Sequence, residues 1–321
     1  MQFTDDELKV HLRREFQEAW DQGFVDANAE HEARHGQTKL LWSNLLGLAL
    51  VEQDMQAKDD RREIELVVAG ASPGTHMPVL LKHVKEWRQT RGVRIHLYDP
   101  QPLDAKLEEF VDEDESMSFR RKPFTDQHAA QWAGSEHCVV FFSDIRSAIH
   151  GKKDHTHKDE VMIEKDMQAQ KTWVKIMQPD YCMLKFHAPH ATRDKSRVRE
   201  SLPYLHGTLY EQAWVGLFSA EYRLFCTQDE IQRGDMQYKT KDIEGHAFYH
   251  THRTRPSTFS VNGKDMPYDE AFAAHVAHKA AGLLEFDEKE LLRDARRMQL
   301  VAHMQFAWTR VRSMRKRMAQ I

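Results

Sequence analysis

Residues 65–76 read ELVVAGASPGTH, and this stretch decides the fold that we expect for the chain. Four of its first five residues are apolar, which predicts a buried strand, and the turn that follows is rich in glycine. A helix is expected next, over Pro78–Arg91. A strand, a tight glycine turn and a helix form the start of a βαβ unit, in which backbone N–H groups can approach a bound ligand closely.

The same alternation of short apolar strands and helices continues to about residue 228. Strands are predicted over Val93–Tyr98, His137–Phe142 and Tyr181–Phe186, and a hairpin-like pair over Glu211–Leu217 and Glu221–Cys226. Further helices are predicted over Gln127–Trp132 and His157–Met177. This order is typical of an α/β fold with a parallel sheet and helical crossovers.

Helices are expected on both sides of this region. The N-terminal helices are predicted over Thr4–Phe24, behind a Thr4 cap, and over Gln37–Met55. After residue 228 we expect a polar stretch, an Asn262-Gly263 turn, and helices over Asp269–Leu284 and Glu288–Ala319. The chain is therefore interpreted as one domain with N-terminal helices (1–60), a catalytic core (61–228) and a C-terminal helical extension (229–321).

Composition excludes several classes of protein. Of the 321 residues 40% are hydrophobic and 30% are charged, and the mean hydropathy is −0.71. These values are typical of soluble globular proteins and exclude fibrous and membrane classes. The best candidate for a membrane span, Leu40–Val51, is interrupted by Ser43 and Asn44 and is shorter than the roughly 20 residues required. We therefore expect no membrane partner.

Charge and cysteine usage point to an intracellular protein. The net charge of −4 argues against a wholly basic nucleic-acid binder, although it allows a local basic groove, and we expect no DNA partner. The stretch from Ala302 onward holds five Lys and Arg residues and no acid, so it is either a phosphate-binding face or a solvated helix end. Three cysteines without metal-ligand spacing and an acidic N-terminus without a signal core indicate a reducing compartment.

A second feature supports a cofactor site beside the glycine turn. The strand after the first helix ends in Tyr98-Asp99-Pro100, and an acid at this place can accept hydrogen bonds from both hydroxyls of a ribose. The pair of turn and acid therefore favours a cofactor that carries adenosine. The alternative is an ordinary turn and a surface aspartate, which any βαβ protein can have.

Four charged residues are expected near the same edge of the sheet. Asp144, Lys185 and Glu221 accompany the ends of predicted strands, and Lys39 opens an apolar helix. A lysine in an apolar strand is costly unless it is paired, and burial or a second cation lowers the pKa of a lysine toward values useful for a base. Each residue alone could be structural, with Lys185 reaching solvent and Glu221 paired with Arg223. The set of four favours catalysis.

These motifs resemble a known family. GQTKLL (36–41), AGASPGTHMPVLLKHV (69–84), LYDP (97–100), SDIRS (143–147), LKFHAP (184–189) and SAEYRL (219–224) are similar, in order and spacing, to motifs of the poxvirus-type mRNA cap-specific ribose 2′-O-methyltransferase. That family also serves as the poly(A) polymerase small subunit. The resemblance covers roughly residues 36–226 and implies a Rossmann-like class I methyltransferase fold, with a mostly parallel seven-stranded sheet and an antiparallel last strand.

The resemblance also implies roles for individual residues. The catalytic tetrad would be Lys39, Asp144, Lys185 and Glu221. S-adenosylmethionine would be surrounded by Gln37, Gly70, Ala71, Pro73, Gly74, Thr75, His76, Asp99, Phe124, Asp144 and Arg146, with Asp99 at the ribose and Phe124 near the adenine. An arginine that the family places just after the Asp99 position is Gln101 here.

The family holds the methylated guanine of the cap between two aromatic rings. Phe218 matches one of them, whereas His190 stands at the position of the other and Thr192 at that of an accompanying acid. Asp242 or Glu244 would supply a carboxylate to the base edge, and we prefer Glu244. Cap recognition thus departs further from the family pattern than the tetrad does.

The implied mechanism needs no metal. Lys185, with Lys39 nearby, would remove the proton of a ribose 2′-hydroxyl or stabilise the developing alkoxide, and Asp144 and Glu221 would orient the two lysines. Histidines do cluster in two places: His150, His155 and His157, and then His246, His250 and His252. Neither group has the cysteines or the helical spacing usual for zinc, so solvated loops or RNA-phosphate contacts are favoured.

The function predicted on this basis is S-adenosylmethionine-dependent 2′-O-methylation of capped mRNA at the nucleotide next to the cap. One alternative is a 2′-O-methyltransferase for RNA without a cap, and another is a non-catalytic RNA-binding processivity subunit of a poly(A) polymerase. The implied partners are capped mRNA and a poly(A) polymerase catalytic subunit. The expected location is the cytoplasm, either of a host cell or in a virion if the protein is viral.

Overall fold

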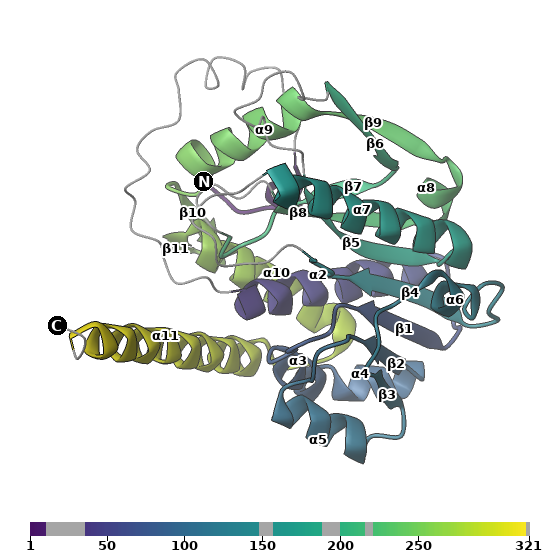
Figure 1. The fold of residues 1–321 in the computed structure, drawn as a ribbon, viewed down its shortest axis with the longest axis horizontal. Coiled ribbons are helices and arrows are strands. Elements are labelled where there is room, and N and C mark those ends of the chain that lie inside the picture. Colours follow the sequence, from purple (N-terminus) through teal and green to yellow (C-terminus); the bar gives the residue numbers. More distant parts are fainter. Residues whose placement is uncertain (11–35, 148–156, 188–199, 216–220, 319–321) are drawn as a thin grey trace.

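A seven-stranded sheet runs through the computed structural model, which describes residues 1–10, 36–147, 157–187, 200–215 and 221–318 (Figure 1). The strands follow the order β3-β2-β1-β4-β5-β8-β7. Their bounds are Ile64–Ala69 (β1), Arg94–Tyr98 (β2), Met117–Arg120 (β3), Cys138–Ser143 (β4), Tyr181–His187 (β5), Thr208–Tyr210 (β7) and Glu221–Thr227 (β8). β1 to β5 are parallel, and β8 is antiparallel to both of its neighbours. The predicted Rossmann-like fold with an antiparallel last strand is confirmed.

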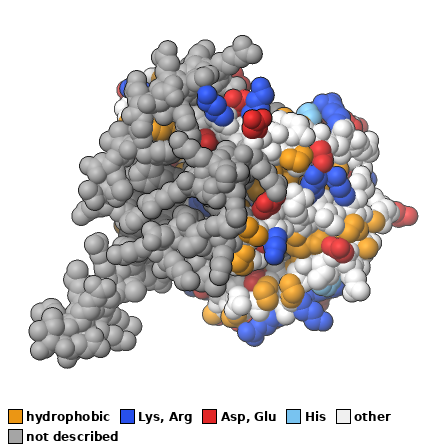
Figure 2. Space-filling view, turned by 45° about the horizontal axis from the view of Figure 1, so that its top comes forward, with side chains coloured by type: hydrophobic (Ala, Val, Ile, Leu, Met, Phe, Trp, Pro, Cys, Tyr) orange, Lys and Arg blue, Asp and Glu red, His pale blue; other side chains and the backbone are white. Residues whose placement is uncertain are grey.

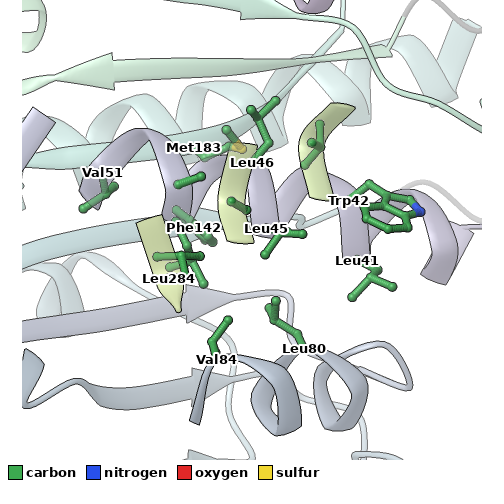
Figure 3. Packing of buried hydrophobic residues seen from close by; sticks show 14 of the residues in the cluster. Leu41, Trp42, Leu45, Leu46, Val51, Leu80, Val84, Phe142, Met183 and Leu284 are labelled. Atoms are coloured by element: carbon green, nitrogen blue, oxygen red, sulfur yellow. The ribbon is translucent and has the colours of Figure 1, made fainter. Parts of the chain in front are cut away.

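The central strands are buried on both faces, because alternate side chains enter two separate cores. Leu66 and Val68 belong to the core beneath α2, whereas Val67 and Ala69 belong to the core on the opposite face. Figure 3 shows the first core, where side chains of α2 meet Phe142 of the sheet. α2 is therefore held directly against the strands whose ends carry the site.

Helices cover both faces. On the first face lie α2 (Gly36–Ala57), α3 (Met77–His83), α4 (Lys85–Arg91), α10 (Tyr268–Leu284) and the start of α11 (Glu288–Met318). The other face is covered by α6 (Asp126–Ala130), α7 (His157–Met177) and a small sheet of β6 (Ser201–Leu205) and β9 (Asp235–Lys239). The predicted helix over residues 78–91 is divided at Val84, which ends α3 and precedes α4.

The remaining elements lie outside the predicted alternation. They are η1 (Asp5–Leu8), α5 (Ala105–Glu113), α8 (Gln228–Gln232), α9 (Thr240–Tyr249), η4 (His250–Thr254), β10 (Thr258–Val261) and β11 (Lys264–Pro267). β10 and β11 form a hairpin around Asn262 and Gly263, both with positive φ, as the turn chemistry predicts. The helices α10 and α11 also follow the prediction. The C-terminal extension is thus helical only in part, since β9, β10 and β11 belong to it.

The predicted helix over Thr4–Phe24 is wrong in its first part. Only a short 3-10 helix, η1, forms, and Thr4 makes no side-chain cap. The chain then becomes extended, because Lys9 pairs with Tyr210 and the Val10 N–H donates to the Leu209 carbonyl at the edge of the sheet. Tertiary pairing with an open strand edge outweighs the local helical pattern. Residues 11–24 lie outside the described residues.

The predicted strand over 211–217 is also wrong in its described part, residues 211–215, and residues 216 and 217 lie outside the described residues. β7 lies earlier, over Thr208–Tyr210, and pairs with β8 as the hairpin-like arrangement requires. The chain leaves the sheet at Glu211, whose N–H donates to the Leu8 carbonyl, and then turns at Trp214, which has a φ of 56°. The apolar residues of this segment therefore line a turn rather than a strand.

Glu211 is buried among histidines. Its Oε1 lies 3.1 Å from His246 Nδ1, and its Oε2 lies 3.5 Å from His250 Nε2. Burial raises the pKa of Glu211 to about 8 and lowers the pKa of His250 well below its ordinary value. Among the described residues, no group of His, Cys, Asp and Glu side chains is arranged as ligands of a metal ion. His150 and His155 lie outside the described residues.

Replacing Glu211 by glutamine is expected to stabilise the protein increasingly as the pH rises. The raised pKa means that the folded state keeps its proton up to about pH 8, whereas the unfolded chain loses it near 4.5. The stability that wild type draws from the protonated carboxyl group is therefore full below about pH 4.5. It declines as the pH rises from there to about 8. The unfolding free energy of Glu211→Gln minus that of wild type should grow by about 3 kcal/mol between pH 5 and 8 in urea titrations. A difference that stays constant with pH would contradict this.

None of the described helices combines the length and the apolar composition that crossing a bilayer requires.

Candidate active site

Charged side chains from four elements converge at one edge of the main sheet. Asp144 directly follows β4, and Lys185 lies near the end of β5. β8 runs in the opposite direction, so its first residue, Glu221, pairs with His187 at the same edge. Lys39 lies in the first turn of α2, which packs on the sheet beside them. The topology therefore brings together the four residues that the sequence singled out, at the edge where open α/β sheets bind ligands.

The two lysines share the two carboxylates. Lys39 Nζ donates to Glu221 Oε1. Lys185 Nζ lies 3.1 Å from Asp144 Oδ1 and 3.5 Å from Glu221 Oε2. Because the two carboxylate oxygens of Glu221 face different lysines, this side chain holds both ammonium groups in one arrangement.

Two arginines join the same cluster. Arg223 donates to Asp144 Oδ1 at 2.6 Å and is 3% exposed, and Arg146 donates to Glu221 Oε2 at 3.3 Å. The sequence assigned Arg146 to the cofactor and considered Arg223 only as a partner of Glu221. The cluster thus contains four cationic side chains and two carboxylates, and positive charge is in excess.

This charge distribution alters the pKa values. Burial lowers the pKa of Lys39, and the charges of Lys185 and Arg223 add to that effect, although Glu221 opposes it. Burial acts against ionisation of Asp144 and Glu221, but the neighbouring cations outweigh it and lower the pKa of both carboxyl groups. Both acids are therefore carboxylates at neutral pH, and the pKa of the Lys39 ammonium group in the same cluster is lowered.

The glycine turn lies against the start of this cluster. Gly70 has a φ of 84°, and a Cβ atom there would lie 2.8 Å from the Ile145 nitrogen and 2.9 Å from the Asp144 carbonyl carbon. Gly74 has a φ of 67°, and a Cβ atom would lie 2.7 Å from the Ala71 oxygen. Both positions therefore require glycine, and the first one lets the end of β1 approach the Asp144 backbone closely.

Replacing Gly70 by alanine is expected to lower the free energy of unfolding by at least about 2 kcal/mol, because left-handed backbone strain adds to a backbone clash. Urea denaturation measures the loss. The matched control is Gly282→Ala in α10, where nothing lies within 4 Å of the added Cβ and φ is not positive. That variant should be unchanged or more stable by up to about 1 kcal/mol. Equal effects of the two substitutions would contradict the reasoning.

Asp99 ties the turn to the end of β2. Its Oδ2 accepts from the Ser72 N–H at 3.0 Å, and its Oδ1 accepts from the Gln101 N–H at 2.8 Å. Each carboxylate oxygen has two lone-pair sites, so both retain capacity for further donors. The predicted ribose contact therefore agrees with the chemistry of this side chain, which also shapes the turn itself.

Gln37 and His76 join α2 to the turn. Gln37 Oε1 accepts from Thr75 Oγ1 at 3.1 Å and from His76 Nδ1 at 2.9 Å, and Asn44 Nδ2 donates to His76 Nε2 at 2.9 Å. Burial lowers the pKa of His76 to about 4, so the ring is neutral at pH 7. The expected cofactor residues Gln37, Thr75 and His76 thus lie together, and Gln37 forms hydrogen bonds with the other two side chains.

A pocket opens between α2 and the turn. Its lining includes Asn44, Gly70, Ser143 and Asp144 beside apolar side chains such as Leu40. Ser143 Oγ lies buried at this pocket and finds no hydrogen-bond partner among the described residues. The enclosed cavity measures about 20 Å³, which is room for a water-sized group. Its mostly apolar lining, with a few convergent polar atoms beside a glycine turn, has the chemistry that suits a small organic cofactor such as S-adenosylmethionine.

The other predicted cofactor and cap residues lie in separate parts of the fold or outside the described residues. Phe124 is 6% exposed and packs edge-on to Tyr98 and Trp173, and Pro73 lies on the exposed side of the turn, next to buried Ala71. Glu244 lies buried in α9. His190, Thr192 and Phe218 lie outside the described residues.

The described surface gives no broad basic face in the view of Figure 2, where acidic and basic side chains are interspersed. The basic stretch from Ala302 belongs to α11, whose C-terminal part extends away from the other elements (Figure 1). Side chains from 305 onward lie outside the described part of the chain. The two interpretations of that stretch, a phosphate-binding face and a solvated helix end, therefore both remain.

Sequence reasoning missed three polar residues that complete the site. Arg223 was considered only as a structural partner of Glu221, and Asn44 and Gln212 were given no part in the site. The signal that could have found them is their residue type: an amide in an apolar helix and a glutamine beside a strand are costly to bury without partners.

Comparison with known proteins gives one family match. Residues 13–273 match a family model described as "Poly A polymerase regulatory subunit". No curated protein matches the chain. Among solved structures, bluetongue virus VP4, described as a multifunctional RNA-capping production line, aligns with a TM-score of 0.45 and 11% identity. The alignment covers 70% of this chain and 33% of VP4, so the chain spans about a third of that protein's length.

Proposed function

The chain belongs to the family of poly(A) polymerase regulatory subunits, and on this premise we propose that it methylates the ribose 2′-hydroxyl of the nucleotide next to the cap of an mRNA. The observation that carries the proposal is the convergence of Lys39 and Lys185 with two carboxylates beside the glycine turn. Two lysines held together, with positive charge in excess, suit the removal of a proton from an alcohol.

The cofactor in this proposal is S-adenosylmethionine. When bound, it supplies a methyl group activated by a positively charged sulfur for direct displacement by an oxygen nucleophile. The turn at Gly70, where glycine allows close approach of the backbone, would lie against it, and Asp99 would accept hydrogen bonds from its ribose. Gln37, at the N-terminus of α2, contacts His76 at the far end of the glycine turn and would lie beside the cofactor there.

The protein supplies the base and the alignment. Lys185 would take the proton of the 2′-hydroxyl, and its ammonium group would then stay beside the developing oxyanion. Lys39 contributes a second cationic side chain close by, held by Glu221. Asp144 and Glu221 keep both nitrogen atoms in place through the contacts described above.

The test compares short RNAs with and without a cap, using labelled S-adenosylmethionine and nuclease mapping of the product. Label on the first nucleotide of the capped RNA alone supports the proposal. Equal label on both RNAs would favour the 2′-O-methyltransferase for uncapped RNA, and label on neither would contradict methyl transfer to RNA.

A second role is favoured by the family match, which covers residues 13–273. We propose that the chain also binds the catalytic subunit of a poly(A) polymerase and supports its processivity. A pull-down with the purified cognate polymerase, followed by measurement of the tail length made with and without this chain, tests it. A lack of both binding and stimulation would contradict this second role.

A further inference from the structure

Gln212 lies fully buried at the centre of the charged cluster. It follows β7 by two residues and is 0% exposed. Its position beside β8 places its carboxamide between Glu221 and Arg223, the two residues that hold the lysines and Asp144. A buried amide must satisfy both a donor and an acceptor group, so its partners define its role.

The carboxamide bonds to opposite charges with its two ends. Oε1 accepts from Arg223 Nε at 2.8 Å and from Ser43 Oγ at 3.4 Å. Nε2 donates to the Glu221 carbonyl oxygen at 2.9 Å and to Glu221 Oε1 at 3.4 Å. A carboxylate could accept from the arginine but could not donate to Glu221, and an ammonium group could do only the reverse.

From this geometry we propose that Gln212 is a positioning residue for methyl transfer. It holds the carboxylate of Glu221 in the orientation that serves Lys39 and Lys185, and it holds Arg223 against Asp144. The inference rests on the proposed function, since it gives this residue a role in the same reaction. It adds a neutral member to a cluster that the sequence described only by its charges.

The first test uses two substitutions at this position. Gln212→Leu removes both ends of the amide, and kcat for methyl transfer to capped RNA should fall roughly 10- to 100-fold while the KM values for RNA and S-adenosylmethionine change by less than about threefold. Gln212→Glu keeps the acceptor for Arg223 and loses the donor to Glu221. The neighbouring cations should keep this carboxyl group ionised, as they do those of Asp144 and Glu221, so kcat of Gln212→Glu should also fall roughly 10-fold or more while both KM values stay close to those of wild type.

The matched control is Tyr204→Phe. Tyr204 is 0% exposed, and its hydroxyl donates to the backbone oxygen of Met167 at 2.9 Å. This variant loses one buried hydrogen bond and leaves the charged cluster and its contacts in place, so Tm should fall and kcat should stay within about threefold. Equal loss of kcat in Gln212→Leu and Tyr204→Phe, or near wild-type kcat in Gln212→Glu, would overturn the proposal.

A second test needs no substrate and separates this proposal from the proposed function. In a double-mutant cycle of Gln212→Leu and Glu221→Leu, the two losses of unfolding free energy should be clearly less than additive, because each substitution alone removes the hydrogen bond between the two side chains. Strict additivity would overturn the positioning role. The two losses can be less than additive while the wild-type protein transfers no methyl group to any RNA. In that case the proposed function is wrong, and the interaction between Gln212 and Glu221 is still supported.

Discussion

Replacing Lys185 by alanine is expected to reduce methyl transfer to capped RNA roughly 10²- to 10⁴-fold, the range that a positioned base contributes. The side chain is 8% exposed and bonds to Asp144 at 3.1 Å, so the remaining cluster has no group that takes its place at that position. The dissociation constant of S-adenosylmethionine should change by less than about threefold, because the glycine turn and Asp99 are separate from the ammonium group. Single-turnover kinetics and calorimetry measure the two quantities.

The control for this experiment is Lys171→Ala. Lys171 is also a buried lysine, and it pairs with Asp235 at 2.5 Å on the opposite face of the sheet. It should lower stability and leave the rate of transfer close to that of wild type. A Lys185→Ala enzyme that keeps near wild-type turnover on capped RNA would remove Lys185 from the mechanism.

Replacing Asp99 by alanine is expected to weaken S-adenosylmethionine binding roughly 100-fold. Two charge-assisted hydrogen bonds to ribose hydroxyls would be lost, and each is worth about 1.5 kcal/mol or more. The turn would also lose the contacts from Ser72 and Gln101 that shape it. With saturating cofactor the rate of transfer should recover most of its wild-type value, since the lysine cluster is untouched. Calorimetry and the rate at several cofactor concentrations test this.

Asp114→Ala is the corresponding control. Asp114 also accepts from a backbone N–H two residues later, that of Ser116 at 3.0 Å, and it precedes β3 at the far end of the strands. Its removal should leave the affinity for S-adenosylmethionine within about twofold of wild type. If both aspartate variants bind the cofactor as wild type does, Asp99 has no part in cofactor binding.

The parts of the fold that the sequence predicts are those with strong hydrophobic patterns. β1, β4, β5 and β8 are mostly buried on both faces, and β2 alternates half-buried polar residues with buried apolar ones. The bounds of α7 and α10 are those expected from their patterns to within a residue. β3 is only four residues long and is half polar. β6 contains Pro203, which argues against a strand, and β9 is mostly polar. These strands form because partners from distant segments pair with them, and local patterns do not report such partners.

The candidate site shows the same division. The charged residues at strand ends are visible because parallel strands deliver their ends to one edge, so Asp144 and Lys185 could be expected near each other. Gln212 and Asn44 could not be placed in the same way, since their roles depend on which buried groups face them across the fold. The predicted strand over 211–217 concealed Gln212 further, because a regular strand would not have turned at Trp214.

The most direct test of the central claim uses two capped RNAs that differ at the first nucleotide, one with a ribose and one with a 2′-deoxyribose. Each is incubated with the protein and S-adenosylmethionine, and the product is analysed by mass spectrometry. The account predicts one added methyl group on the ribose RNA and none on the deoxyribose RNA. Methylation of both RNAs, or of neither, would contradict transfer to the 2′-oxygen by the lysine cluster.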